Sequence, residues 1–228
     1  MKHASLNQIA GAVTSVGATA LSTYIFAIRP WHLRWGATDE EVKRALPGDD
    51  LVPAPKLNAT HAITIDAPPA EVWPWLAQIG QGRGGFYSYD WLENLMGLNI
   101  HSADRILPEY QHLKVGDIVP FAPGGFGPPV AAIERGRALV LGGKIGAGTE
   151  GPFAIGDKTL GAYMNVSWQF FIELAGGNAT RLIERFRLDW EPPSLKNFVF
   201  YHLFLEPGSF IMERKMLLGI KQRVEAAR

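Results

Sequence analysis

The sequence contains no cysteine among its 228 residues. This absence excludes disulfide bonds, thiolate nucleophiles, and zinc or iron–sulfur sites with cysteine ligands. It does not identify the compartment, because a chain without cysteine is stable under oxidising and reducing conditions alike.

The sequence also lacks an excess of charge of either sign, because Lys plus Arg and Asp plus Glu both total 22. Proteins that bind nucleic acid carry a clear basic excess or stripe, so nucleic acid is not expected as the main partner. The segment from Gly80 to Gly85 contains G-x-G-x-x-G, but it follows a helical pattern instead of a strand. We therefore interpret it as a turn, and expect neither a dinucleotide nor another cofactor.

One long uncharged stretch runs from Leu6 to Ile28. At ~1.5 Å per helical residue it is long enough to cross a hydrocarbon core of ~30 Å. We interpret residues 1–35 as a membrane anchor that places residues 6–28 in the lipid bilayer. A cleaved signal peptide and a soluble helix packed on the domain are the alternatives. Basic residues are more frequent after the stretch than before it, which predicts a domain on the cytoplasmic side of a bacterial inner membrane.

Residues 36–56 contain several turn-forming proline, glycine and aspartate residues. We interpret them as a linker between the anchor and a domain formed by residues 57–228. A short helix is expected inside this linker, with Thr38 as its N-cap and Glu41 completing a capping box.

Two stretches in the second half of the chain alternate between apolar and polar residues. They are residues 164–174 and 180–190, and Gly177 lies between them. Alternation of this length predicts an antiparallel hairpin with one buried and one wet face. A turn centred on Gly177 would point both apolar faces the same way. The expected cross-strand pairs are Leu174 with Thr180, Phe170 with Glu184, and Trp168 with Phe186.

The order of the remaining patterns indicates the fold class. Strand-like residues 60–66 precede an amphipathic helix over residues 67–79 and a shorter helix over residues 89–96. Short strands and the hairpin follow, and after Pro193 the pattern is helical to the end, with a break expected at Pro207. We therefore predict an α+β fold of the helix-grip type, with an N-terminal apolar helix. In it, a curved antiparallel sheet wraps around a long C-terminal helix.

The stretch from Ile65 to Trp73 (IDAPPAEVW) resembles the first strand–helix junction of the START-like SRPBCC superfamily. That superfamily includes polyketide cyclases, lipid-transfer START domains and birch-pollen-allergen-like plant proteins. The resemblance implies a helix-grip fold and an apolar cavity, but no single reaction, because members bind, transport or transform different ligands. It covers roughly residues 29–228. Segments that resemble a bacterial branch of the superfamily are residues 29–38, 84–93, 99–106 and 212–221.

Glu184 is the one carboxylate on an otherwise apolar strand face. Burial of an unpaired carboxylate is costly, so Glu184 must be paired, be neutral or reach water in a cavity. We expect it to face the pocket as a polar anchor or as a general acid or base, with Asp90 as a second candidate for proton transfer. A structural ion pair with Arg83 or Arg105 is the alternative.

Further pocket residues are expected around the two short helices and in the densely apolar residues 197–212. Simple core packing and contact with the bilayer are the alternatives for the latter segment. No second histidine lies at a ligand spacing from His101, so no metal site is expected. The predicted ligand-binding residues are Trp168, Phe170, Leu182, Glu184, Phe186, Leu188, Tyr87, Trp91, Phe200 and Phe204.

Together these features predict a protein that binds or transfers a hydrophobic small molecule, such as a lipid, isoprenoid or polyketide, in an internal cavity at a membrane. The alternative is a cyclase- or dehydratase-type enzyme that uses a pocket carboxylate for proton transfer. A structural protein with a filled core is a third hypothesis, against which a cavity would argue. A titratable side chain exposed inside the cavity would favour the enzyme.

Overall fold

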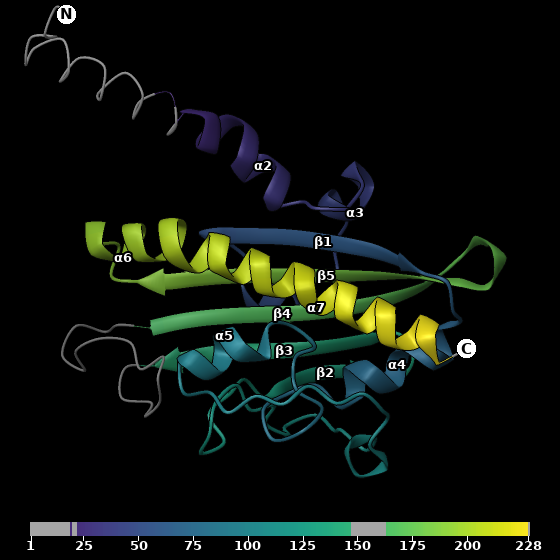
Figure 1. Cartoon of the computed structure of the whole chain (residues 1–228). Coiled ribbons are helices and arrows are strands. Elements are labelled where there is room, and N and C mark those ends of the chain that lie inside the picture. Colours follow the sequence, from purple (N-terminus) through teal and green to yellow (C-terminus); the bar gives the residue numbers. More distant parts are fainter. Residues whose placement is uncertain (1–18, 20–21, 147–162, 228) are drawn as a thin grey trace, which may run out of the picture.

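The computed structural model describes residue 19, residues 22–146 and residues 163–227. Within these residues, five antiparallel strands form one curved sheet in the order β1-β5-β4-β3-β2. The long C-terminal helix α7 (Glu206–Ala226) crosses one face of this sheet diagonally (Figure 1). The predicted α+β architecture of a curved sheet and a long C-terminal helix is confirmed. The strands are β1 (Leu57–Ile65), β2 (Val130–Glu134), β3 (Ala138–Gly146), β4 (Tyr163–Ala175) and β5 (Ala179–Glu191).

Strands β4 and β5 form the predicted hairpin. Its turn, η5 (Gly176–Asn178), contains Gly177 at a φ of 72°, a left-handed conformation that glycine adopts without steric cost. The alternating apolar residues, such as Trp168 and Phe186, lie on the inner face of the sheet, whereas Phe171 and Ile183 pack in a separate cluster with Leu46. All three expected pairs are confirmed. These pairs are Leu174 with Thr180, Phe170 with Glu184, and Trp168 with Phe186.

Three helices cover the inner face of the sheet. Besides α7, these are α4 (Pro69–Ala77) and α5 (Asp90–Leu95), both close to the predicted ranges. Leu76 of α4 and Leu217 of α7 are fully buried against Leu139 and Leu182 of the sheet. The main hydrophobic core therefore lies between these helices and the inner face.

The hairpin pattern predicted that the outer face of the sheet contacts water, but other segments of the chain cover much of this face. The turn of 3-10 helix η2 (Asp49–Leu51) and helix α3 (Asp39–Lys43) lie over it, so the segment interpreted as a linker packs on the sheet. Arg185 of β5 is 1% exposed on this face, where its guanidinium donates to Thr60, to Asp49 and to backbone carbonyls of residues 41, 42 and 44. Alternation identifies the polar face of a strand, but it does not reveal which other segment covers that face.

The expected capping box at the start of α3 is confirmed. Thr38 accepts a hydrogen bond from the backbone N–H of Glu41, and the Glu41 carboxylate accepts one from the backbone N–H of Thr38. The same carboxylate forms an ion pair with Arg181 of β5 at 2.6 Å. The cap thus also fixes α3 to the sheet.

The predicted N-terminal apolar helix is not supported. Most of the stretch from Leu6 to Ile28 lies outside the described residues. The described part continues as π-helix η1 (Tyr24–Ile28) and helix α2 (Arg29–His32). In the part of the chain that the structure describes, no helix has the length and apolar character needed to span a bilayer.

The C-terminal helical segment is not split at Pro207 as predicted, because the backbone stays helical from residue 195 to residue 226. Ser194 caps α6 (Leu195–Val199) by accepting a hydrogen bond from the backbone N–H of Asn197. The chain continues as π-helix η6 (Phe200–Leu205), and Pro207 lies in the first turn of α7, where its missing N–H is tolerated. One further short helix, η3 (Pro108–Tyr110), lies in the loops between α5 and β2.

Candidate functional site

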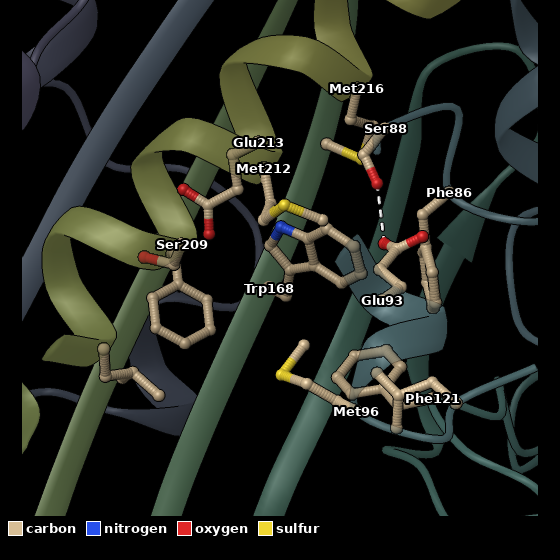
Figure 2. Close-up of a pocket in the computed structure, with 13 residues that line it drawn as sticks. Phe86, Ser88, Glu93, Met96, Phe121, Trp168, Ser209, Met212, Glu213 and Met216 are labelled. Atoms are coloured by element: carbon tan, nitrogen blue, oxygen red, sulfur yellow. Dashed lines mark hydrogen bonds between the residues drawn. The ribbon is translucent and has the colours of Figure 1, made fainter. Parts of the chain in front are cut away.

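A cavity of about 230 Å³ lies between α7, α5 and the inner face of the sheet (Figure 2). Its volume is just below the range of roughly 300–1,000 Å³ that is usual for small-molecule sites. Helix α7 contributes residues at positions i, i+3, i+4 and i+7, which share one helical face. The lining residues are Phe86, Ser88, Glu93, Met96, Leu98, Phe121, Trp168, Phe186, Leu205, Ser209, Met212, Glu213 and Met216.

Aromatic rings form one wall of this cavity. The ring centroid of Trp168 lies 5.5 Å from that of Phe121 and 6.1 Å from that of Phe86, and these two phenyl rings meet edge to face. Trp168 comes from the middle of β4, whereas the two phenylalanines come from the loops beside α5. Such packing fixes the ring planes and leaves an apolar surface toward the hollow.

Two carboxyl groups belong to the cavity wall. Glu93 of α5 and Glu213 of α7 lie on either side of Trp168 (Figure 2). Ser88 donates a hydrogen bond of 2.6 Å to Glu93 Oε1, whereas the buried Glu93 Oε2 accepts none. Burial raises the pKa of Glu93, and the Ser88 hydrogen bond only partly offsets this effect. Burial of this carboxyl thus favours its protonated form relative to an exposed glutamate.

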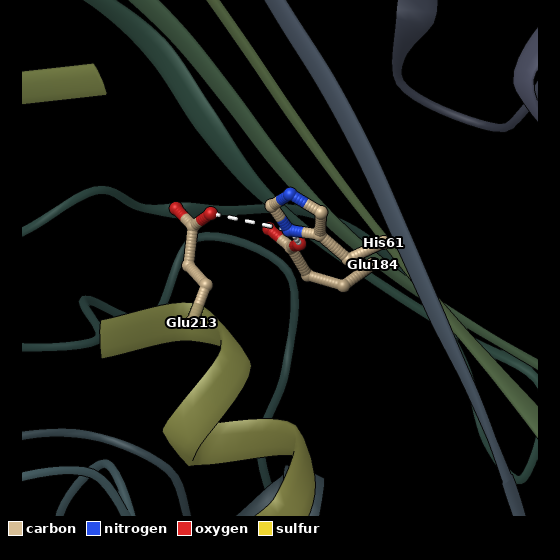
Figure 3. Close-up of side chains that lie close together, drawn as sticks. All are labelled: His61, Glu184 and Glu213. Carbon is tan, nitrogen blue, oxygen red and sulfur yellow. Dashed lines mark hydrogen bonds and ion pairs between the residues drawn. The ribbon is translucent and has the colours of Figure 1, made fainter. Parts of the chain in front are cut away.

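Glu213 also belongs to a second group of side chains, the buried cluster His61–Glu184–Glu213 (Figure 3). His61 Nδ1 lies 2.8 Å from Glu184 Oε2 and 3.3 Å from Glu213 Oε2. Only the shorter contact is a well-formed hydrogen bond; the longer one is an ion pair, and Glu213 Oε2 accepts no hydrogen bond. The cluster thus connects the cavity wall to the middle of the sheet.

Surrounding groups fix the cluster from behind. His61 Nε2 donates to the backbone carbonyl of His32 at 2.8 Å, so Nδ1 faces the two carboxyl groups and a proton lies between Nδ1 and Glu184 Oε2. Trp168 Nε1 donates to Glu184 Oε1 at 2.7 Å. Burial alone would lower the pKa of His61, but the hydrogen bond and charge of Glu184 raise it to about 10. Burial and the charge of Glu213 raise the pKa of Glu184 to about 7.

The same three side chains could hold a metal ion. One nitrogen of His61 and one oxygen each of Glu184 and Glu213 lie within 4.8 Å of one another. Imidazole and carboxylate ligands suit zinc and similar divalent ions, and a histidine ligand usually donates its other N–H to an acceptor such as a carbonyl. A metal there would have to replace the proton on His61 Nδ1.

The predicted site residues fall into different places. Trp168 and Phe186 line the cavity, whereas Glu184 points toward the same face but is fully buried and does not line it. Phe170 and Leu182 lie in the main core, Leu188 lies in a separate cluster, and the hydroxyl of Tyr87 donates to the backbone carbonyl of Trp75. Trp91, Phe200 and Phe204 are exposed, and Asp90 accepts two hydrogen bonds from Ser102.

The proposed pairing of Glu184 with an arginine is wrong. Arg83 donates to the backbone carbonyls of Ile79 and Ala77, and the partner of Glu184 is His61. The sequence did contain a signal for this partner, because His61 lies at an apolar-face position of the predicted strand 60–66. The contribution of Glu93 and Glu213 depends on how α5 and α7 dock on the sheet, which no local pattern specifies.

A further group of charged side chains attaches the N-terminal segment to the start of α7. The carboxylate of Glu206 accepts hydrogen bonds from Arg29 at 2.7 and 2.9 Å, and lies 3.0 Å from ring nitrogens of His32 and His202. Burial would raise the pKa of Glu206, but these partners hold it at about 2. The carbonyl of His32 therefore reaches His61 from a position fixed by Glu206.

Comparison with known proteins gives no family assignment. No family model matches the chain, and no curated protein matches it. Among solved structures, the hypothetical protein jhp0584 from Helicobacter pylori is 13% identical with a TM-score of 0.46, covering 81% of this chain and 95% of that one. Protein MLL2253 from Mesorhizobium loti is 14% identical with a TM-score of 0.38, covering 74% and 98%.

A norcoclaurine synthase from Thalictrum is 16% identical with a TM-score of 0.36, covering 75% of this chain and 94% of that one. Values this low leave the function of the chain to be argued from its own site.

Proposed function

We propose that the protein binds an apolar small molecule in the cavity between α7, α5 and the sheet. The observation that carries this proposal is a hollow of about 230 Å³ beside a closely packed core. A bound guest would remove its apolar surface from water by contact with the aromatic and methionine side chains of the wall.

The ligand class that fits this wall is apolar, and lipids, isoprenoids and polyketides belong to it. Glu93 and Glu213 are the only carboxyl groups of the described residues that line the cavity, so they would orient the polar end of the guest. Ligand pockets usually combine such an apolar wall with a few polar groups that fix orientation.

We also propose that the protein works at a bilayer, attached through residues 6–28. Support comes from exposed apolar side chains on two adjoining segments, η1–α2 and η6, which meet where the Tyr24 hydroxyl donates to the His202 carbonyl. An exposed apolar surface of this kind is typical of a contact with lipid or protein. Its exposed residues are Ile25, Phe26, Ile28, Trp31, Phe200, Leu203 and Phe204.

Vesicle flotation tests the bilayer proposal on the full chain. We expect the protein to float with vesicles of phosphatidylethanolamine and phosphatidylglycerol, and the double variant Leu203→Ser, Phe204→Ser to float less. Recovery of the full chain in the soluble fraction, without detergent and without flotation, would contradict attachment to a membrane.

A second function uses the same cavity for proton transfer, as in cyclases and dehydratases. The observation in its favour is that Glu93, with its raised pKa, and Glu213, ion-paired to His61, both face the hollow. Glu93 would donate a proton and Glu213 would accept one. Asp90 and Glu184, the residues first expected in this role, do not line the cavity.

Ligand binding is tested with N-phenyl-1-naphthylamine, which fluoresces in apolar surroundings. We expect saturable binding to the wild-type protein and at least ten-fold weaker binding to Met212→Trp, whose indole fills the cavity. Leu174→Trp is the matched control, because Leu174 is 69% exposed at the end of β4. Ser209→Leu repeats the test if Met212→Trp does not fold. Equal binding by wild type and both cavity variants would overturn the proposal, as would the absence of saturable binding.

A further inference from the structure

The polar atoms of the cavity wall show a consistent bias toward acceptors. We infer that the ligand carries hydrogen-bond donors at its polar end, as an amine or a hydroxyl group, and is not an acid such as a fatty acid or a phosphate. The inference rests on the proposed function, because it names the chemistry of the molecule that this cavity binds.

Every side-chain donor of the wall already has an acceptor elsewhere. Trp168 Nε1 donates to Glu184 Oε1 at 2.7 Å, and Ser88 Oγ donates to Glu93 Oε1 at 2.6 Å. Ser209 Oγ donates to the backbone carbonyl of Glu206 at 3.1 Å. A ligand that needs donors from the protein, such as a carboxylate, would have to break one of these bonds.

The carboxylate oxygens of the cavity wall, in contrast, are not fully satisfied as hydrogen-bond acceptors. Glu93 Oε2 is buried and accepts no hydrogen bond, whereas the buried Glu213 Oε2 forms only the longer ion pair of 3.3 Å with His61 Nδ1. A buried oxygen without a donor is unfavourable, and a ligand N–H or O–H would satisfy it. Glu93 is 5% exposed and Glu213 is 7% exposed, so bulk water does not readily fill this role.

The charges around the cavity also disfavour an anionic ligand. Among the described residues, no lysine or arginine lines it. The nearest basic residues of α7 point elsewhere, with Arg214 over the ring of Trp35 and Lys215 over the ring of Tyr89. His61 is cationic, but two carboxylates surround it. An anionic ligand would therefore meet carboxylates without a cation to compensate them.

The aromatic wall favours a cation over an anion as well. The rings of Phe86, Phe121 and Trp168 form one wall of the hollow, and ring faces attract ammonium groups when water is excluded. Glu93 Oε2 can accept a hydrogen bond from either an ammonium or a hydroxyl group of a ligand. Both ligand chemistries fit the same pair of oxygens.

The experiment compares three ligands with the same tail, namely 1-octylamine, 1-octanol and octanoate at pH 7. Each displaces N-phenyl-1-naphthylamine from the full-length protein, and the midpoint gives its affinity. We expect the amine and the alcohol to bind at least ten-fold more tightly than octanoate. Octanoate binding as tightly as the amine would overturn the inference, as would failure of all three to displace a bound probe. Failure of the probe itself to bind would instead contradict the proposed function.

Two substitutions assign the effect to the carboxyl groups. Glu93→Gln and Glu213→Gln each place a donor beside the hollow, so we expect the preference for octylamine over octanoate to fall at least ten-fold. Glu109→Gln, on exposed η3, is the matched control and should leave the preference unchanged. Glu93→Gln carries the test if Glu213→Gln does not fold, because Glu93 does not contact His61. An unchanged preference in Glu93→Gln would contradict the inference.

Discussion

His61 of β1 and Glu184 of β5 are directly opposite each other in the sheet, with their side chains 2.8 Å apart. Neither side chain is more than 1% exposed. The His32 carbonyl holds the imidazole on its other side, and the Trp168 indole holds the second carboxylate oxygen. The pair is therefore fully desolvated and held from its two sides by α2 and β4.

Removal of one partner of this pair should be more costly than removal of both. We expect His61→Gln to lower the free energy of unfolding by about 3–5 kcal/mol, because Glu184 would remain buried without its partner. The double variant His61→Gln, Glu184→Gln should be more stable than His61→Gln alone. Urea unfolding followed by circular dichroism measures both values. A double variant less stable than the single one would contradict the pairing.

Stability should fall as the pH rises from 7 to 10. The pKa of His61 is raised from its ordinary value of 6.5 to about 10, so the folded protein holds this proton more tightly than the unfolded chain. The stabilisation is complete below pH 6.5 and is lost as the pH rises through 10. Glu184, raised to about 7, acts in the same direction between its ordinary value of 4.5 and pH 7.

Urea unfolding at a series of pH values checks this dependence. The wild-type protein should lose stability over pH 7 to 10, and His61→Gln should lose much less over the same range. A wild-type stability that is flat or rises over this range would show that His61 is not protonated in the folded state.

Two glycines of α7 should respond in opposite ways to alanine. At Gly219 a Cβ would overlap the backbone carbonyl of Tyr87, so Gly219→Ala should destabilise the fold by about 1–3 kcal/mol. At Gly208 a Cβ would meet no atom within 4 Å, so Gly208→Ala should stabilise the helix by roughly 0.5–1 kcal/mol. Thermal unfolding of both variants gives the comparison. Equal effects would mean that α7 does not pack closely against Tyr87.

The outer face depends on a buried arginine. Arg185→Met should cost about 3–5 kcal/mol, because the substitution removes one partner of the buried ion pair with Asp49 and the donor to the backbone carbonyls of residues 41, 42 and 44. Arg137→Met is the matched control, since Arg137 pairs with Glu134 where both side chains are 59% exposed, and should cost at most about 1 kcal/mol.

Limited proteolysis should also cut Arg185→Met more readily within residues 36–56, which this side chain holds on the sheet. Resistance equal to that of wild type would show that other contacts keep this segment in place.

The sequence predicted the parts of the fold that local chemistry determines. The alternation of apolar and polar residues, with a turn at Gly177, predicted the register between β4 and β5. The spacing of Thr38 and Glu41 predicted the capping box. Both depend on interactions between residues that are close in sequence, with a turn or a helix start that admits few alternatives.

The site was predicted less well because it combines distant segments. His61 and Glu184 are 123 positions apart, and their pairing depends on the register between β1 and β5, which no short loop fixes. Glu213 reaches them from α7, whose rotation about its axis is set by packing. The polar and turn-forming residues of the segment 36–56 predict a linker. The sequence does not show that oxygen atoms of this segment accept hydrogen bonds from Arg185.

The position of His61 on an inner-facing site of β1 has a consequence for how the sheet assembles. If β1 added to β5 one residue out of register, the imidazole would turn to the opposite side and leave Glu184 and Glu213 together in the core without a counter-charge. A sheet misaligned in this way would bury two carboxyl groups without a counter-charge. It would therefore be less stable than the sheet with the native register. The cluster His61–Glu184–Glu213, of which Glu213 also lines the cavity, therefore favours the native register of the edge strand β1, which is distant in sequence from β5.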